Sequence, residues 1–385
     1  MTLRVGIVAA EPSGDVLGAG LIRALRAARP DIEFEGIGGP RMIAAGCVSR
    51  FPMERLSVMG LVEVLRHLRE LLAIRRALLD HWRGQPPDLY VGVDAPDFNL
   101  TLERRLRQLG VPTVHYVSPT VWAWRPGRVK TLRAAADLVL SIFPFEGDFL
   151  AAHGVRARYV GHPLADEIEP VADPAPVRAR LGLPPDGPVL AVLPGSRLSE
   201  IGAIGPSFVG AARLLAERYP GLRLVTPLVN AATRERFAAL RAELAPDLDW
   251  LFVDSAAQDA LPAADVVLTA SGTATLEALL VGRPMVVGYR VHALTYWTAR
   301  LLRLVRVRHI AMANLLAGEG LAPELVQGAC TAQNLAAAVA ALLDAPWRRA
   351  EIGARYAQLA AGLRRDTSRE AAAAVLSLVE ASRGG

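Results

Sequence analysis

Short apolar runs alternate with longer helical patterns along most of the chain, and this alternation constrains the fold more than any other feature. Runs such as Leu3–Ala9 and Val189–Leu193 are each followed by a segment whose apolar residues recur at helical spacing. This order is typical of parallel βαβ units. The alternation stops at the proline-rich segment 164–185 and then restarts. The sequence therefore predicts an α/β protein with two parallel-sheet domains.

The expected division places residues 1–169 in an N-terminal Rossmann-like domain and residues 170–345 in a C-terminal one. Residues 346–385 are rich in alanine and helical in pattern. We expect them to pack back on the N-terminal domain or on a partner protomer. In open parallel sheets, ligands bind beyond the carboxyl ends of the strands. The loops that directly follow the predicted strands are therefore the places where a site is expected.

The composition indicates which cellular compartment and which classes of ligand suit the protein. The net charge is +5, and no nucleic-acid-binding pattern accompanies it, so phosphate or anionic lipid is favoured over nucleic acid. Although 52% of the residues are hydrophobic, no uncharged apolar run reaches the ~18 residues of a membrane span. No signal peptide is indicated, and two distant cysteines suit a reducing compartment. These observations predict a cytoplasmic protein without a disulfide framework or a zinc site.

The predicted second domain contains two loops that suit an anion. Each follows a predicted strand and precedes a helix, whose first N–H groups form a ready site for phosphate. With one arginine, the two helix starts would neutralise a diphosphate without a metal. The alternative for the loop at 271–273 is an ordinary capped helix. The candidate residues of these two loops are Gly195, Ser196, Arg197, Ser271, Gly272 and Thr273.

Glu277 lies four residues after Thr273, on the same face of the predicted helix. The spacing is one residue too long for a capping box, so the carboxylate is available to another partner. Its two oxygens suit a ribose diol.

The predicted first domain places carboxylates after its strands. Glu11 and Asp15 stand in the loop after the first strand, which lacks the Gly-x-Gly-x-x-Gly pattern and disfavours a nicotinamide cofactor. Asp94 stands at the tip of a later strand, while Asp97 or Asn99 can cap the helix that follows. Such acids suit the deprotonation of an acceptor hydroxyl.

Two segments, 56–82 and 291–308, combine apolar residues with several arginines. A core-facing helix with a solvated basic face is one interpretation. The other is an amphipathic surface that touches a membrane or an acyl chain. The membrane-contact candidates are Met59, Leu61, Val62, Leu65, Trp297 and Arg300.

Blocks spread over nearly the whole chain resemble lipid-A-disaccharide synthases, in the order in which that family has them. They include Glu-Pro-Ser-Gly-Asp (11–15), Asp-Ala-Pro-Asp-Phe-Asn (94–99), Tyr-Val-Ser-Pro-Thr-Val-Trp-Ala-Trp-Arg (116–125), Leu-Pro-Gly-Ser-Arg (193–197), Ala-Ser-Gly-Thr-Ala-Thr-Leu-Glu (270–277), Met-Val-Val-Gly-Tyr-Arg (285–290) and Asn-Leu-Leu-Ala-Gly (314–318).

The resemblance implies a GT-B glycosyltransferase fold, with the acceptor bound by the first domain and the UDP-sugar by the second. It implies that the sugar of UDP-2,3-diacylglucosamine is joined to 2,3-diacylglucosamine 1-phosphate (lipid X). The products would be UDP and the β-1′,6 disaccharide of lipid A. No cofactor and no metal are implied. Because both substrates carry acyl chains, we expect peripheral association with the cytoplasmic face of the inner membrane, and a homodimer is possible.

The resemblance also suggests residue roles. Asp94 resembles the family's general base, and Glu11 and Asp15 its acidic first loop. The nucleotide-binding set would comprise the two loops above together with Glu277, Tyr289 and Asn314.

The chain departs from the family pattern at two positions. Ala10 stands where we expect glycine, and Ala313 where we expect proline. Both changes relax the specification of the backbone in these two loops.

Two other functions fit a chain with two α/β domains. A UDP-sugar 2-epimerase would share the nucleotide site but has no need of two basic amphipathic segments. A solute-binding protein has a similar outline but is usually exported, and no signal peptide is indicated here.

Overall fold

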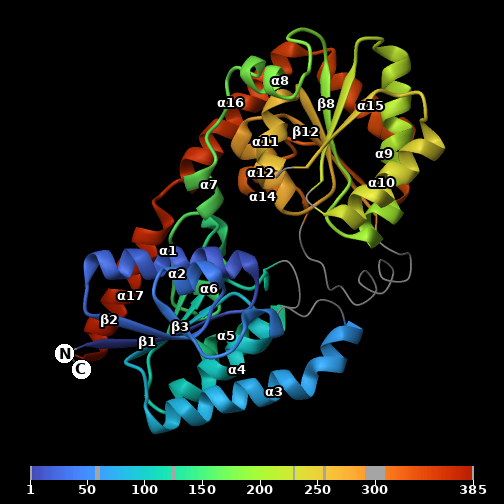
Figure 1. Cartoon of the computed structure of the whole chain (residues 1–385). Coiled ribbons are helices and arrows are strands. Elements are labelled where there is room, and N and C mark those ends of the chain that lie inside the picture. The colour runs from blue at the N-terminus through green and yellow to red at the C-terminus, as the bar shows by residue number, and fades with distance from the viewer. Residues whose placement is uncertain are drawn as a thin grey trace. The chain divides into compact units, whose positions relative to one another are not determined.

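The computed structural model describes residues 2–56, 61–122, 126–228, 230–254, 257–290 and 308–383. The chain forms two compact units, shown in Figure 1. The first unit contains Met1–Asp166 and Leu363–Gly385, and the second contains Glu167–Gly362. Each unit is built around its own parallel sheet, which confirms the predicted α/β class.

The sheet of the first unit has the strand order β3-β2-β1-β4-β5-β6-β7. Its strands are β1 (Leu3–Ala9), β2 (Ile32–Ile37), β3 (Cys47–Ser49), β4 (Leu89–Val93), β5 (Thr113–Tyr116), β6 (Leu138–Ser141) and β7 (Ala157–Tyr159). The helices of this unit are α1 (Pro12–Ala28), α2 (Pro40–Ala44), α3 (Leu61–Gly84), α4 (Pro96–Arg107), α5 (Val129–Ala135), α6 (Pro144–Ala152), α7 (Pro163–Glu167) and α17 (Thr367–Arg383).

The sheet of the second unit has the order β10-β9-β8-β11-β12-β13. Its strands are β8 (Val189–Leu193), β9 (Arg223–Pro227), β10 (Trp250–Val253), β11 (Val266–Thr269), β12 (Met285–Tyr289) and β13 (Glu324–Val326). Its helices include α8 (Ala175–Arg180), α9 (Leu198–Arg218), α10 (Ala231–Leu244), α11 (Ala257–Ala260), α12 (Thr273–Val281), α14 (Met312–Ala317), α15 (Ala332–Leu343) and α16 (Pro346–Leu363).

In both sheets the strand order reverses direction beside the first strand. β1 lies between β2 and β4, and β8 lies between β9 and β11. The last paired residues are Ala9 with Val93 in the first sheet and Leu193 with Thr269 in the second. The neighbouring strands therefore end level with one another. In open α/β sheets, this switch point is where ligands bind.

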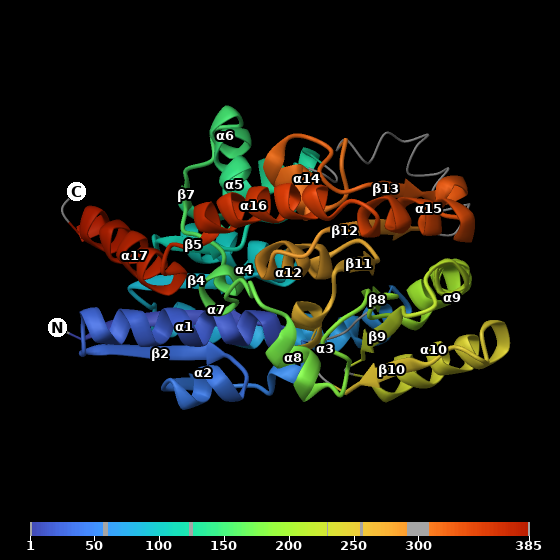
Figure 2. The same ribbon diagram turned by 90° about the horizontal axis from the view of Figure 1, so that it is seen from above.

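The C-terminal helix α17 packs against α1, although the two are far apart in sequence (Figures 1 and 2). Its apolar side chains, among them Val375 and Val379, belong to the same buried cluster as Leu21 and Leu25 of α1. α16 belongs instead to the second unit. Of the segment 346–385, only the part from Leu363 onward thus joins the first unit.

The return of the chain to the first unit is fastened by one carboxylate. Asp166 accepts hydrogen bonds from the backbone N–H groups of Arg365 at 3.0 Å, Asp366 at 3.1 Å and Thr367 at 2.6 Å. These are N–H groups that lie at the start of α17 and lack acceptors within the helix.

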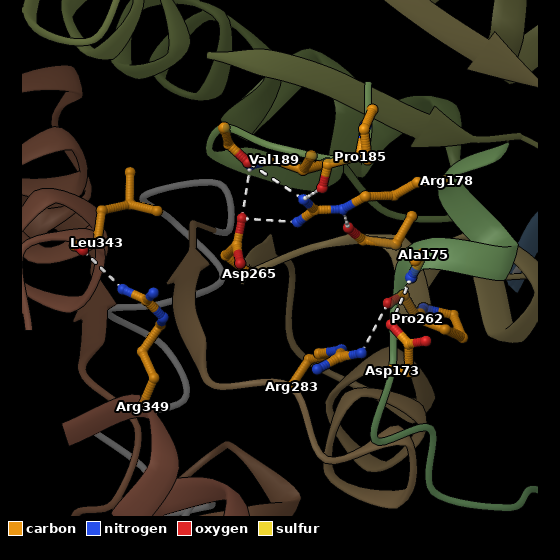
Figure 3. A network of polar contacts seen from close by, with 12 residues as sticks. Asp173, Ala175, Arg178, Pro185, Val189, Pro262, Asp265, Arg283, Leu343 and Arg349 are labelled. Carbon is orange, nitrogen blue, oxygen red and sulfur yellow. Dashed lines mark hydrogen bonds and ion pairs between the residues drawn. The ribbon is translucent and has the colours of Figure 1, made fainter. Parts of the chain in front are cut away.

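The proline-rich linker is anchored to the amino ends of the strands in the second sheet, as Figure 3 shows. Arg178 is buried and donates to the carbonyl oxygen of Ala263 at 2.9 Å and to Oδ2 of Asp265 at 2.9 Å. The same carboxylate oxygen accepts the N–H of Val189 at 2.8 Å. This network ties the linker to the starts of β8 and β11, at the end of the sheet opposite the candidate loops.

Two helices that follow strands begin with a proline. Pro12 and Pro96 occupy the first turns of α1 and α4, where a missing N–H costs nothing. In the part of the chain that is described, no helix is long and apolar enough to span a membrane.

Candidate functional site

A pocket of about 430 Å³ lies at the carboxyl ends of β8, β9 and β11 in the second unit. Its volume is within the range of small-molecule sites, which is ~300–1,000 Å³. Most of the residues predicted from the second-domain loops line it. Those residues are Gly195, Ser196, Arg197, Ser271, Gly272, Thr273 and Glu277.

The start of α12 forms one wall of this pocket. Gly272 has φ +113° and ψ −154°, a conformation essentially restricted to glycine. The Thr275 hydroxyl donates to the Gly272 carbonyl oxygen at 2.8 Å and accepts the N–H of Met312 at 3.0 Å. These contacts hold the turn, while the N–H groups of Thr273 and Ala274 lie in the first helical turn, without acceptors inside the helix. This wall suits an anion.

The start of α9 is different, because a carboxylate of the protein already occupies it. Oε2 of Glu200 accepts the N–H of Ser196 at 3.1 Å and the N–H of Arg197 at 3.3 Å. A side chain on Gly195, which has φ +101°, would collide with this carboxylate. Glu200 therefore caps α9 from within, and its carboxylate engages the two N–H groups that directly precede the helix rather than those of the first helical turn.

Arg197 remains the cation of the pocket. Its Nη1 lies 3.2 Å from Oε1 of Glu200, and 62% of its side chain is exposed. A surface ion pair of this kind contributes little stability, about 0–1 kcal/mol. The guanidinium can therefore exchange this partner for an incoming anion at small cost.

Glu277 faces the same pocket from the first turns of α12. Burial raises the pKa of its carboxyl group. Among the described residues, no hydrogen bond or ion pair to this carboxylate is found. Glu277 is thus a partly buried acceptor that suits a hydroxyl-bearing ligand.

Two other predicted nucleotide-binding residues lie apart from the pocket lining. Asn314 is buried and donates to the carbonyl oxygen of Ala322 and to Oε1 of Glu324, both at 2.8 Å. Its own Oδ1 accepts the Ala322 N–H at 2.8 Å. The amide therefore closes the loop after α14. Tyr289 is half-buried at the end of β12, where burial and the charge of Glu200 raise the pKa of its hydroxyl.

The sequence reasoning missed Glu200 and Asn230, which also line the pocket. Glu200 stands three residues after Arg197, the spacing of a capping box. Asn230 follows β9, and its Oδ1 accepts the N–H of Ala232 at 2.9 Å as the N-cap of α10. Both signals were present in the sequence as helix-start patterns.

In the first unit, Asp94 lies at the tip of β4, directly beside the end of β1. It has φ +50°, and Ala95 has φ +43°, both in the left-handed region. The buried Asn99 holds this turn by donating to the Asp94 carbonyl oxygen at 2.8 Å, and Tyr90 donates to Asn99 at 2.9 Å. Strained backbone held in this way is common at functional sites. The half-buried Asp94 carboxylate is thus presented at the switch point.

The two acids of the first loop have different surroundings. Glu11 is half-buried and precedes α1, at the end of β1. Asp15 is only 3% exposed, and its two oxygens accept the N–H groups of Arg41 at 3.0 Å and Met42 at 2.9 Å. The structure thus gives Asp15 the task of capping α2, so we leave it out of the candidate bases.

The loop after β5 rests on a buried carboxyl group. Trp122 donates from Nε1 to Oε1 of Glu146 at 3.1 Å and packs edge-on against Phe145 at 4.7 Å between centroids. Oε2 of Glu146 accepts the N–H of Phe143 at 3.2 Å. Trp122 therefore packs onto the first turn of α6. Burial raises the pKa of Glu146 to about 7.

The membrane-contact candidates are not tested by the structure. Met59, Trp297 and Arg300 lie outside the described residues. Leu61, Val62 and Leu65 belong to α3, but their side chains also lie outside the described part.

Comparison with known proteins identifies the family. The family model "Lipid-A-disaccharide synthetase" matches residues 5–378. The chain belongs to the lipid-A-disaccharide synthase family. The synthase of Pseudomonas aeruginosa (strain LESB58) is 55% identical over 98% of both chains. That of Alkalilimnicola ehrlichii is 53% identical over 97% of this chain and 98% of its own. The predicted family and the predicted hexosyltransferase class are therefore confirmed.

Solved structures confirm the GT-B fold predicted for this family. A UDP-GlcNAc 2-epimerase from Neisseria meningitidis bound to UDP-GlcNAc has a TM-score of 0.65 at 12% identity, covering 98% of this chain and 100% of that chain. A UDP co-structure of S. aureus MnaA has a TM-score of 0.63 at 14% identity, and the match covers 100% of this chain and 97% of that chain. The glycotransferase of kitacinnamycin has a TM-score of 0.61 at 18% identity, and the match covers 98% of this chain and 99% of that chain. At these identities the likeness is one of fold alone.

The buried Glu146 predicts a pH-dependent stability. The folded protein holds the Glu146 proton up to about pH 7, whereas the ordinary pKa is 4.5. Since the folded state binds more protons between these values, the free energy of unfolding falls as pH rises from 4.5 to about 7. At about 1.4 kcal/mol per pKa unit, the loss is roughly 3 kcal/mol. In Glu146→Gln the free energy of unfolding, measured by urea denaturation at pH 5 and at pH 8, should decrease less with rising pH than in the wild type. Exposed Glu33→Gln is the control, and an equal pH dependence in wild type and Glu146→Gln would contradict the assignment.

Proposed function

We propose that the protein transfers the sugar of UDP-2,3-diacylglucosamine to 2,3-diacylglucosamine 1-phosphate and releases UDP. The product is the β-1′,6-linked tetraacyl disaccharide 1-phosphate, formed with inversion at the anomeric carbon. The observation that carries the proposal is the pocket at the β8 and β11 tips, where Arg197 and the start of α12 meet. Membership of the family supports the acyl-sugar substrates.

The pocket suits a uridine diphosphate. The diphosphate would bind the N–H groups at the start of α12 and the Arg197 guanidinium, which together offset its charge as it leaves. Glu277, with its available oxygens, would accept hydrogen bonds from the ribose hydroxyls. Two solved proteins of this fold, the N. meningitidis epimerase and S. aureus MnaA, bind UDP-GlcNAc and UDP. Their ligands support a uridine nucleotide as the ligand of this chain.

In the proposed reaction, Asp94 is the general base. Its carboxylate accepts the proton of the acceptor 6-hydroxyl while that oxygen bonds to the anomeric carbon of the donor. The bond from this carbon to the diphosphate oxygen breaks, and its electron pair leaves with UDP. Attack from the face opposite UDP inverts the anomeric configuration. Glu11 follows the neighbouring strand, at the start of α1, and is the second candidate for the base.

The epimerase alternative is not favoured. The epimerases among the solved structures share only 12–14% identity with this chain, whereas curated lipid-A-disaccharide synthases share 50–55%. A transfer between two acyl sugars also accounts for the basic amphipathic segments. We propose that these segments contact the cytoplasmic face of the inner membrane. We further propose that the protein acts as a homodimer.

Asp94→Asn should lose most of the turnover, because general-base catalysis is worth roughly 100- to 10,000-fold. The amide preserves the size of the side chain but cannot accept the proton. The measurement is kcat for disaccharide formation in detergent micelles, with Glu11→Gln assayed in parallel. If Asp94→Asn keeps near-normal kcat while Glu11→Gln loses it, the base is Glu11 and our assignment is wrong.

Arg197→Ala should weaken UDP binding by roughly 10- to 100-fold, the loss of one charge-assisted contact. Calorimetric titration with UDP measures this. The matched control is Arg213→Ala, because Arg213 lies on the same helix, is also 62% exposed and also pairs with a glutamate. Equal affinity in wild type and Arg197→Ala would place the diphosphate elsewhere.

The membrane proposal predicts that the wild type floats with vesicles containing anionic phospholipid and less with neutral vesicles. Glutamate substitutions of Arg69, Arg300 and Arg303 should reduce flotation, because they reverse the attraction to the anionic surface. Wild-type protein that stays at the bottom of the gradient with both vesicle types would contradict membrane association.

A further inference from the structure

Two arginines from different elements meet at the first turn of α4, just beyond Asp94. Arg75 of α3 donates from Nη1 to the backbone carbonyl oxygen of Asp97 at 3.4 Å. Arg128, directly before α5, pairs through Nη2 with Oδ1 of the same residue. Both guanidinium groups therefore lie around Asp97, three residues after the candidate base.

Arg75 differs from Arg128 in its surroundings. It is half-buried, and its guanidinium lies over the ring of Phe98 at 5.9 Å. No carboxylate among the described side chains forms an ion pair with it. Burial accordingly lowers the pKa of Arg75, without an opposing carboxylate contribution. A half-buried arginine without a counter-charge is expensive to keep unless an anion reaches it.

Arg128 has a partner that is easily exchanged. The Asp97 side chain is 89% exposed, so rotating it into water costs little, whereas the Arg128 side chain is only 32% exposed. A dianionic phosphate would replace one surface carboxylate and reach the second, unpaired guanidinium as well. Guanidinium groups suit this exchange because each presents two parallel N–H donors to phosphate oxygens.

We propose that Arg75 and Arg128 form a binding site for a phosphate monoester at the first turn of α4. The inference rests on the proposed function, where the monoester is the 1-phosphate of the acceptor sugar. The position is consistent with that role, since Asp97 in the first turn of α4 is only three residues after Asp94. In a hexopyranose, C1 and the carbon that bears the 6-hydroxymethyl group both flank the ring oxygen, so a group that binds the 1-phosphate lies close to one that contacts the 6-hydroxyl. The phosphate of a membrane lipid headgroup has the same chemistry and is the second possible ligand of this site.

The test compares two acceptors in neutral detergent micelles without anionic lipid. One is 2,3-diacylglucosamine 1-phosphate, and the other is the same sugar without its phosphate. Arg75→Ala and Arg128→Ala should each raise KM for the phosphorylated acceptor roughly 10- to 100-fold. The KM for the unphosphorylated acceptor and for the UDP-sugar should not change. Arg128→Lys should retain part of the preference because it retains the charge. Exposed Arg76→Ala, on the same helix as Arg75, is the control.

Three results would overturn the site. An equal loss for both acceptors would mean that the arginines only support the fold around Asp94. An unchanged preference would place the phosphate elsewhere. Reduced flotation with anionic vesicles, together with an unchanged acceptor preference, would assign the arginines to a lipid headgroup.

The site can also be tested if the proposed reaction fails. If the wild type forms no disaccharide, titration with glucosamine 1-phosphate and with glucosamine still measures phosphate recognition without turnover. Binding of the phosphorylated sugar that Arg75→Ala and Arg128→Ala weaken would then support the site. Identical binding of the two sugars by the wild type would overturn it.

Discussion

The reversal of strand order beside β1 and beside β8 is the constraint on which the candidate sites depend. Parallel strands end at one edge of a sheet, and chain connections leave that edge in opposite directions at the switch point. Because the last paired residues of β8 and β11 are level, the loops around Arg197 and Gly272 must lie side by side. The same geometry in the first unit sets Asp94 beside Glu11. The buried Arg178–Asp265 pair holds the opposite ends of β8 and β11.

The two units present different chemistry at these edges. The first unit presents carboxylates, with Asp94 held in a left-handed turn by the buried Asn99. The second unit presents an arginine and a helix start. Glu200 partly neutralises the second site, because it caps α9 and pairs with Arg197. The N–H groups at the start of α12 and the Arg197 guanidinium supply attraction for an anion.

Residues whose partners are local could be predicted from the sequence, and residues whose partners are distant could not. The glycine turns and the pocket position of Glu277 follow from strand–turn–helix patterns within about ten residues. Asp15 had the same acidic character as Asp94, yet its partners Arg41 and Met42 lie in another helix. No spacing rule connects these positions.

The sequence by itself determined the α/β class, the order of strands and helices along the chain, and the family. Hydrophobic periodicity and helix-start patterns are local, and the family blocks are contiguous. Only the tertiary structure decided which polar side chains form hydrogen bonds within the protein and which are available to a ligand. It assigned Asp15 and Asn314 to buried hydrogen bonds, and it brought Arg75 and Arg128 together at Asp97. The physical reason is that a side chain's availability depends on donors and charges that packing brings from elsewhere in the sequence.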